Sequence, residues 1–228
     1  TLPTIGDEVK VISKYLVGEG QKQGAILFEN DAAGIAGRDD FVKYFPEAGG
    51  TILSQEPAQF GQTDYRPSLL KLADAKPQVM LVSITAGLLQ MAQQYKQLGL
   101  KFTVAGTTFF ADPATIADPA AEGFVHTQVR IDAPPELEAE FKAKYGVNME
   151  FFVRQYYNAT QSVLTVADKL LSEGKPLTGQ SMHDELFAIG KFKGLIPLEF
   201  KSNTATVPLD IDVMKGGKDV TIKQMSAD

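Results

Sequence analysis

The chain has 228 residues, with 28 acidic and 22 basic side chains and a formal net charge of −6. A nucleic-acid partner requires a basic stripe that meets phosphates, so we expect no nucleic acid to bind. The chain has no cysteine and two histidines, His126 and His183. This composition excludes disulfides, thiolate metal sites and cysteine nucleophiles, and it leaves little for histidine chemistry. We therefore expect no metal site and no cofactor.

The chain also lacks the signals of membrane insertion. No stretch approaches the roughly 18 uncharged apolar residues that a transmembrane helix requires. The first ten residues have neither the basic segment nor the apolar core of a secretion signal, and the chain begins at Thr1 rather than at methionine. We expect a processed protein or a piece of a longer one.

The first half of the sequence alternates between strand and helix patterns. Continuous apolar runs of strand length are typical of strands buried on both faces, and apolar residues at helical spacing lie between them. We predict strands over 25–28, 51–53, 79–82 and 102–104, and helices over 8–17, 37–45 (ended by Pro46), 68–75 and 88–98. Short links between alternating strands and helices predict an α/β fold, a doubly wound parallel sheet with helices on both faces.

The second half has a different pattern. We predict a strand over 124–129, helices over 136–145 and 181–189, and a β-like tail over 197–222 with turns at 202–203 and 216–217. The helix predicted from Glu150 to Ser172 carries apolar residues on nearly every face. A helix of this kind is expected to be covered by other structure.

Small and hydroxylated residues follow three of the predicted strands. Parallel sheets bind ligands beyond the carboxyl ends of their strands, where free N–H groups suit a carboxylate or another polar group. The same residues are also typical of helix caps and turns, and both readings stay open. The residues expected to line one concave ligand surface are Ile35, Ser83, Thr85, Ala86, Thr107 and Thr108.

Other motifs point away from chemistry. The glycines Gly34 and Gly37 lack the remainder of a phosphate-binding pattern, and no Gly-Lys-Ser/Thr follows them. His183 lacks the second histidine of a zinc-binding helix, and His126 is expected to be a hydrogen-bonded strand residue. No nucleophile, base and orienting group can be assembled, so we expect no enzyme.

Several weak motifs in a shared order resemble a known family, the type I periplasmic binding proteins of the branched-chain amino acid (Leu/Ile/Val-binding) class, the receptors of ABC importers. The resemblance covers essentially the whole chain. The segments that carry it are 25–31 with Gly37, Phe60-Gly61-Gln62-Thr63-Asp64-Tyr65, 94–100, Ala121-Glu122-Gly123, Gln155-Tyr156-Tyr157-Asn158-Ala159, 194–200 and Gly216-Gly217-Lys218.

The resemblance implies two α/β lobes that close on a ligand like a hinge. Residues 1–127 would form the second lobe, 128–196 part of the first lobe, and 197–228 strands that return to the second lobe. The opening part of the first lobe would be missing. The implied function is a periplasmic or extracellular solute-binding receptor that delivers a small metabolite to the membrane permease of an ABC importer.

The ligand contacts carry over only in part. Ile35 and Thr85 stand where amino-acid-binding members often carry aromatics, and Thr108 stands where they carry an acid that pairs the ligand ammonium. Because an unpaired ammonium in a closed cleft is costly, a small or aromatic carboxylate fits better than a free amino acid, and amino-acid-like compounds remain open. Two alternatives also remain: the ligand-sensing effector domain of a transcriptional regulator, and an α/β enzyme.

The helix from Glu150 to Ser172 has no predicted partner sheet in this chain. Exposed large apolar side chains carry a penalty of roughly 1.5–3 kcal/mol each. We expect this segment either to pack against a second copy of the chain, which is favoured, or to collapse onto the second lobe. With one complete wall to its cleft, the chain is expected to bind ligand weakly or not at all.

Overall fold

The computed structural model describes residues 3–129, 131–200, 205–206 and 208–225. The chain divides into two compact units. The larger unit comprises Thr4–Gln128 and Pro208–Asp228, and the smaller unit comprises Thr1–Pro3 and Val129–Val207. The first division lies one residue from the expected boundary at 127/128. The second lies eleven residues beyond the expected boundary at 196/197 and keeps residues 197–207 with the smaller unit.

The larger unit is built on a seven-stranded sheet in the order β10-β9-β5-β4-β3-β1-β2. The pairs β1·β2, β1·β3, β3·β4 and β4·β5 are parallel, whereas β9 joins β5 and β10 joins β9 antiparallel. The predicted parallel sheet of four strands is therefore confirmed. The strands are β1 (Gln23–Glu29), β2 (Thr51–Ala58), β3 (Val79–Ser83), β4 (Thr103–Gly106), β5 (Val125–Gln128), β9 (Leu209–Lys215) and β10 (Lys218–Met225).

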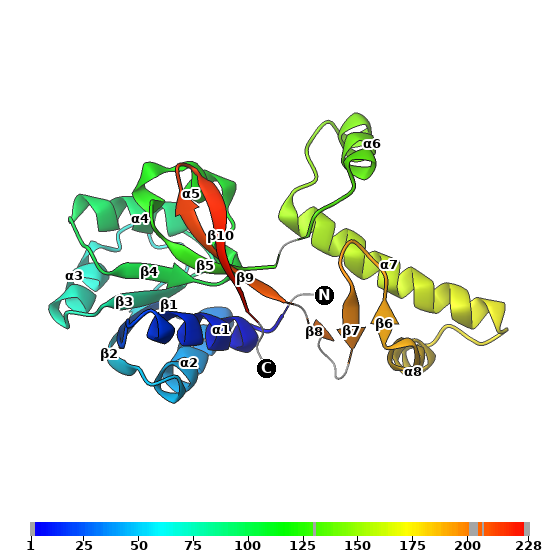
Figure 1. Cartoon of the computed structure of the whole chain (residues 1–228), viewed down its shortest axis with the longest axis horizontal. Helices are drawn as coiled ribbons and strands as arrows, with labels where there is room; N and C mark the ends of the chain where they lie inside the picture. The colour runs from blue at the N-terminus through cyan, green and yellow to red at the C-terminus, as the bar shows by residue number, and fades with distance from the viewer. Residues whose placement is uncertain (1–2, 130, 201–204, 207, 226–228) are drawn as a thin grey trace. The chain divides into compact units, whose positions relative to one another are not determined.

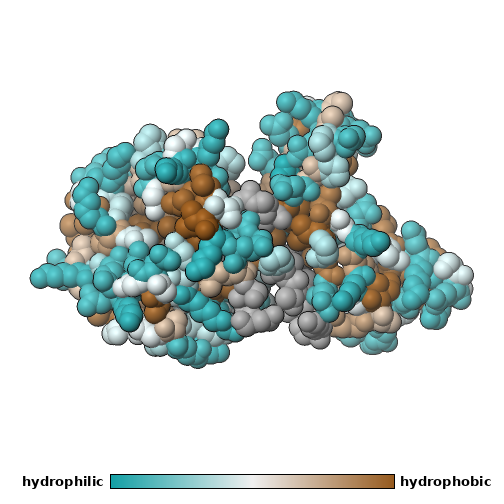
Figure 2. Space-filling model, in the orientation of Figure 1, coloured by the Kyte–Doolittle hydropathy of each residue, from teal (hydrophilic) through white to brown (hydrophobic). Residues whose placement is uncertain are grey.

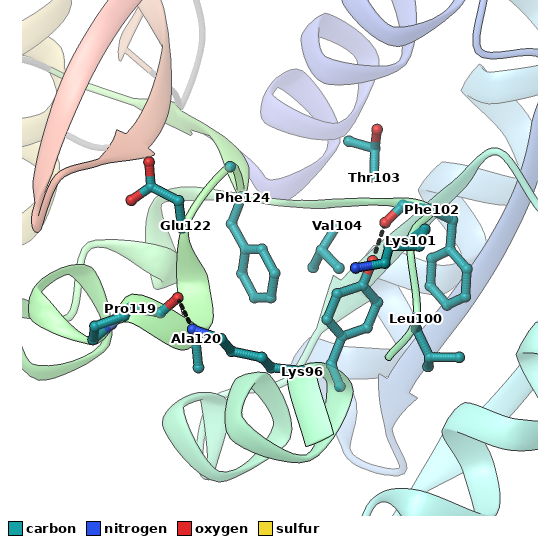
Figure 3. Close-up of a pocket in the computed structure, with 12 residues that line it drawn as sticks. Lys96, Leu100, Lys101, Phe102, Thr103, Val104, Pro119, Ala120, Glu122 and Phe124 are labelled. Carbon is teal, nitrogen blue, oxygen red and sulfur yellow. Dashed lines mark hydrogen bonds between the residues drawn. The ribbon is translucent and has the colours of Figure 1, made fainter. Parts of the chain in front are cut away.

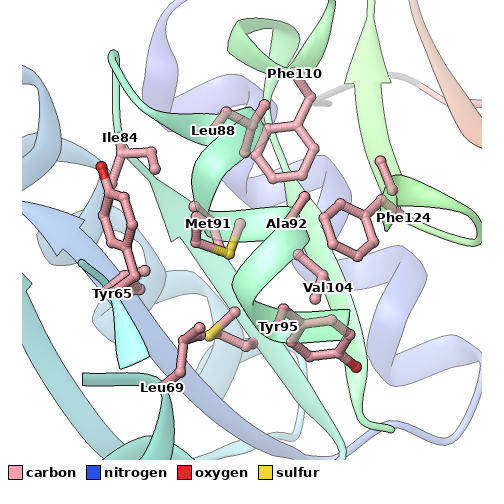
Figure 4. Close-up of a cluster of buried hydrophobic side chains, with 14 of the residues drawn as sticks. Tyr65, Leu69, Ile84, Leu88, Met91, Ala92, Tyr95, Val104, Phe110 and Phe124 are labelled. Carbon is pink, nitrogen blue, oxygen red and sulfur yellow. The ribbon is translucent and has the colours of Figure 1, made fainter. Parts of the chain in front are cut away.

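Helices cover both faces of this sheet, as Figure 1 shows. On one face of the sheet, Gly24 of β1 lies against Phe41 and Phe45 of α2. On the other face, Ala25 and Leu27 belong to one buried core with residues of α3 and α4. Figure 4 shows that second core, in which Tyr65, Met91 and Phe110 pack together. The helices are α1 (Ile5–Gly18), α2 (Ala32–Glu47), α3 (Arg66–Asp74), α4 (Leu88–Gln97), α5 (Pro113–Ala117) and the 3-10 turns η1 (Thr108–Phe110) and η2 (Pro119–Ala121).

Two elements, α2 and β2, include a proline near their C-terminal ends, and Pro46 is predicted from the sequence to end α2. The α2 helix runs through Pro46 to Glu47, because the amide of Ala48 still bonds the carbonyl of Tyr44 at 3.0 Å and closes the last turn. The β2 strand begins at Thr51, as predicted, and continues to Ala58. Its Pro57 is tolerated because β2 is an edge strand, where a missing N–H disrupts no central ladder.

The smaller unit contains α6 (Pro135–Tyr145), α7 (Phe151–Ser172) and α8 (Gly179–Ile189). Its strands β6 (Lys191–Phe192), β7 (Leu198–Phe200) and β8 (Ala205–Thr206) form an antiparallel sheet in that order. The turn predicted at 202–203 lies outside the described residues. The turn predicted at 216–217 is confirmed, because Gly216 and Gly217 join β9 to β10 with φ of 60° and 74°.

The long helix α7 buries a largely polar stripe. Its buried residues are Gln155, Asn158, Ser162, Val166 and Leu170. Asn158 is fully buried, and its Oδ1 accepts from the amide of Leu195 at 2.7 Å. Apolar side chains lie on the exposed part of the helix instead: Phe152, Tyr156, Val163, Leu164 and Leu171. Figure 2 shows apolar surface over the region of α7.

Within the described residues, no helix combines the length and the apolar character that crossing a bilayer requires.

Candidate functional site

The six residues predicted to bind ligand all lie at or just after the carboxyl ends of three adjacent strands, β4, β3 and β1. Ile35 lies in the first turns of α2, after β1. Ser83 ends β3, and Thr85 and Ala86 follow it before α4. Thr107 and Thr108 follow β4 at the start of η1. The topology thus brings the predicted residues to the side of the sheet where its parallel strands end, which we call the carboxyl edge.

These residues differ in how much surface they offer. Thr85 is exposed, and Ile35, Ser83 and Ala86 are partly buried. Thr107 and Thr108 are buried, with exposed fractions of 5% and 6%. Ser83 packs closely against α2. A Cβ placed on Gly37 of that helix would lie 2.2 Å from the Ser83 Oγ. Glycine at position 37 is what allows α2 to approach the strand end this closely.

The helix start after β1 has a structural explanation. The side chain of Asp31 caps α2 by accepting from the amide of Gly34 at 2.7 Å. A Cβ on Gly34 would lie 2.1 Å from the backbone oxygen of Glu29, so only glycine fits this turn. Asp31 and Gly34 therefore act here as a helix cap and a turn residue.

A buried carboxylate lies behind Thr85. Glu29, the last residue of β1, is fully buried, and its Oε2 accepts from the Thr85 amide at 2.8 Å and from the Thr85 hydroxyl at 2.5 Å. The second oxygen, Oε1, is also buried and has no hydrogen-bond partner in the described part of the chain. Glu29 therefore fixes the loop after β3 while one of its acceptors stays unused.

A second buried carboxylate lies behind Thr108. Glu8 of α1 is 5% exposed, and its Oε2 accepts from the Thr108 amide at 2.6 Å and the Thr108 hydroxyl at 2.7 Å. The hydroxyl of Thr127 on β5 donates to the same oxygen at 2.6 Å. Burial raises the pKa of Glu8 above its usual value, although these hydrogen bonds and the charge of nearby His126 act in the opposite direction.

Tyr65 closes the far side of the Thr85 loop. Its hydroxyl donates to the carbonyl of Ala86 at 3.1 Å, and Figure 4 shows that hydroxyl beside Ile84. Burial, together with the negative charge of Glu29, raises the pKa of Tyr65 to about 12. The tyrosine is therefore a neutral donor at ordinary pH and holds the carbonyl of Ala86 in place.

Sequence reasoning did not find Glu8 or Glu29. Glu8 reads as an acidic residue in the first turn of a surface helix, and Glu29 as the polar end of a strand. Their partners lie 100 and 56 residues away in sequence. One signal for Glu29 was present in the sequence. Glu29 directly follows the apolar run 25–28, and in a strand buried on both faces the next residue also points toward a buried face.

His126 is a buried strand residue with both ring nitrogens engaged. Its Nδ1 lies 3.0 Å from the carbonyl oxygen of Thr127, and its Nε2 lies 3.0 Å from Asp219 Oδ1. Asp212 on β9 pairs with His126 across the two strands. The possible ligand atoms of His126, Asp212 and Asp219 all lie within 4.8 Å of one another, near enough to share a metal ion. Its observed contacts are those of a structural hydrogen-bonded pair, as expected for this histidine.

A separate hollow lies at the opposite end of β4. Its volume is about 510 Å³, and Figure 3 shows Phe102, Phe124 and Lys96 around it. Lys96 Nζ donates to the carbonyl of Pro119 at 2.9 Å, and the Tyr95 hydroxyl donates to the carbonyl of Phe102. Tyr95 and Lys96 are thus engaged in contacts within the fold, and this hollow is a weaker candidate site than the carboxyl ends of the strands.

Comparison with known proteins places this architecture in a family. A family model described as "Periplasmic binding protein" matches residues 1–219. The chain belongs to this family of periplasmic binding proteins. A search of curated proteins finds no match.

Solved structures share the fold at low sequence identity. The solute-binding protein of an ABC transporter from R. palustris, in complex with benzoate, is 18% identical with a TM-score of 0.81, and the match covers 98% of this chain and 64% of that one. A branched-chain amino acid ABC transporter protein from Thermus thermophilus, with bound valine, is 20% identical with a TM-score of 0.83 and coverages of 98% and 65%.

A third structure is the solute-binding protein from Rhodopseudomonas palustris BisB5 in complex with 3,4-dihydroxybenzoic acid. It is 22% identical, with a TM-score of 0.77 and coverages of 98% and 66%. The chain thus spans about 64–66% of the length of these proteins. At these identities, the similarity establishes a shared fold.

The raised pKa of Glu8 predicts a pH-dependent stability. Between the unfolded value near 4.5 and the higher folded value, the native state holds more protons than the unfolded state, so stability falls as pH rises through this window. Glu8→Gln removes this titration. We expect the free energy of unfolding of Glu8→Gln, relative to the unmodified chain, to increase as pH rises through that window and then to level off.

Urea unfolding from pH 4 to pH 8 measures this difference. Glu47→Gln, at an exposed position near the end of α2, is the matched control for loss of one carboxylate. A difference between Glu8→Gln and the unmodified chain that stays constant over the whole range would contradict the prediction.

Proposed function

We propose that the chain is the ligand-binding part of a periplasmic or extracellular solute-binding receptor, which captures a small metabolite for the membrane permease of an ABC importer and catalyses no reaction. The observation that carries the proposal is the family match over nearly the whole chain. The geometry supports it, because three adjacent parallel strands end in polar loops at the edge where α/β sheets bind ligands.

The larger unit would then be the second lobe of the receptor and the smaller unit part of the first. The ligand residues would be Ile35, Ser83, Thr85, Ala86, Thr107 and Thr108. The ligand class we propose is a small or aromatic carboxylate or an amino-acid-like compound. Benzoate, 3,4-dihydroxybenzoic acid and valine, which occupy three structures of the same fold, are the probes that this proposal suggests.

Titration of the isotopically labelled chain with these three compounds, followed by NMR, tests the function. We expect at least one compound to shift the amide signals of Thr85 and its neighbours, with an affinity in the millimolar range because the chain spans about 64–66% of the length of these solved proteins. Thr85→Val removes a hydroxyl at the proposed contact and is expected to weaken binding about 5- to 10-fold, the effect of one hydrogen bond.

Thr51→Val is the matched control. Thr51 is an exposed threonine and the first residue of β2, so it lies at the amino ends of the parallel strands, away from the proposed site. Shifts that spread over the chain without including the loops after β3 and β4, or equal effects of the two substitutions, would contradict the assignment of the site.

We propose further that the isolated chain self-associates through α7. The exposed fractions of Phe152, Tyr156 and Leu171 are 47%, 74% and 60%, whereas the buried stripe of the same helix is largely polar. Covering several large apolar side chains stabilises an assembly by roughly 1.5–3 kcal/mol for each one fully buried. A second copy of the chain is the occupant to which this proposal commits.

Sedimentation of the double variant Tyr156→Lys/Val163→Lys tests the self-association. We expect the unmodified chain to sediment as a dimer or larger species at tens of micromolar and the double variant as a monomer. Leu70→Lys is the control, because Leu70 is an apolar residue of α3 with a comparable exposed fraction of 49%. A monomeric unmodified chain at this concentration would rule out the proposal.

A further inference from the structure

Thr85 and Thr108 have no hydrogen-bond donor left to offer. A threonine carries one hydroxyl donor and one backbone N–H. In Thr85 both point to Glu29 Oε2, and in Thr108 both point to Glu8 Oε2. Each hydroxyl oxygen keeps its lone pairs. Toward a ligand, both threonine side chains can therefore act only as hydrogen-bond acceptors.

The carboxylates that hold these donors are not neutralised by a cation. In the described part of the chain, neither Glu8 nor Glu29 forms a salt bridge with lysine or arginine. The basic side chain with an electrostatic effect on Glu8 is His126. Glu29 also keeps one buried oxygen without a partner. A buried carboxylate acts strongly on its surroundings because little water screens it. The raised pKa of Tyr65, due in part to Glu29, is consistent with this.

We propose that this edge of the sheet selects ligands that present a hydrogen-bond donor or a positive charge to it, an ammonium or a hydroxyl group, and disfavours a carboxylate at the same place. The inference rests on the proposed function, since it concerns the same site. A carboxylate on the ligand would have to be held elsewhere, away from Thr85 and Thr108.

The two buried carboxylates change the ligand preference that the sequence predicts for this site. The threonine at position 108 left no acidic side chain for an ammonium, so a free amino acid was disfavoured. In the structure a carboxylate is present directly behind that threonine, 2.7 Å from its hydroxyl oxygen, but it comes from α1. A second one lies behind Thr85. The negative charge expected of an ammonium-binding site is thus supplied from a different part of the chain.

Two matched pairs of probes separate the donor from the rest of the ligand. Valine and 3-methylbutanoate differ by the ammonium group, and 3,4-dihydroxybenzoate and benzoate differ by the two hydroxyls. We expect, in NMR titrations of the full chain, that the donor-bearing member of at least one pair binds about tenfold more tightly, which corresponds to about 1.4 kcal/mol.

The variant Glu29→Gln keeps an acceptor for Thr85 but removes the charge and replaces the free oxygen by an amide donor. We expect it to reduce the preference within the pair to less than about threefold. Glu47→Gln, which removes an exposed carboxylate near the end of α2, is expected to leave the preference unchanged. The NMR spectrum of each variant reports whether it is folded, and the two pairs test the inference on the unmodified chain even where a variant does not fold.

The outcomes distinguish the two claims. Equal binding within both pairs, or tighter binding of benzoate and 3-methylbutanoate, overturns this inference and leaves the proposed function standing. A preference that persists unchanged in both Glu29→Gln and Glu8→Gln overturns the assignment to these carboxylates. If none of the four probes shifts the signals of the loops after β3 and β4, the proposed function of this edge fails, and the inference fails with it.

Discussion

Two buried carboxylates hold the backbone where it leaves the central parallel strands. A strand end in a parallel sheet leaves polar backbone groups that no neighbouring strand can bond, and burying them unpaired is costly. Glu29 bonds the first loop after β3, and Glu8 bonds the first residues after β4. Each carboxylate accepts an amide and a hydroxyl from one threonine, so both loops are fixed by charge-assisted hydrogen bonds.

The Glu8 contact also determines how α1 lies on the sheet. Its Oε2 is bonded to Thr108 after β4 and to Thr127 on β5, which are neighbouring strands. The same helix buries Val9, Ile12 and Leu16 against the sheet face. The apolar stripe of α1 supplies the burial, and the carboxylate in its first turn fixes the register of the helix against the two strand ends.

The sequence predicted the elements that depend on local pattern. The buried run Ala25–Phe28 and the short links around it were enough to place a parallel sheet with helices on both faces. The long-range contacts were not accessible in this way. Whether Glu8 is solvated or buried depends on what α1 packs against, and Thr108 is 100 residues away. The same limit applies to α7. Its apolar residues are evident in the sequence, but which face of the helix is buried depends on what packs against it, and within this chain that face contains Asn158 and Ser162.

Amide hydrogen exchange at Thr85, followed by NMR, tests the central claim most directly. Thr85 lies in an exposed loop, so its amide is protected only if it is bonded to Glu29. The account predicts exchange as slow as that of amides within the strands, and loss of this protection at Thr85 but not at Thr108 in Glu29→Ala. Exchange of the Thr85 amide at the rate of a free loop amide in the unmodified chain would contradict it.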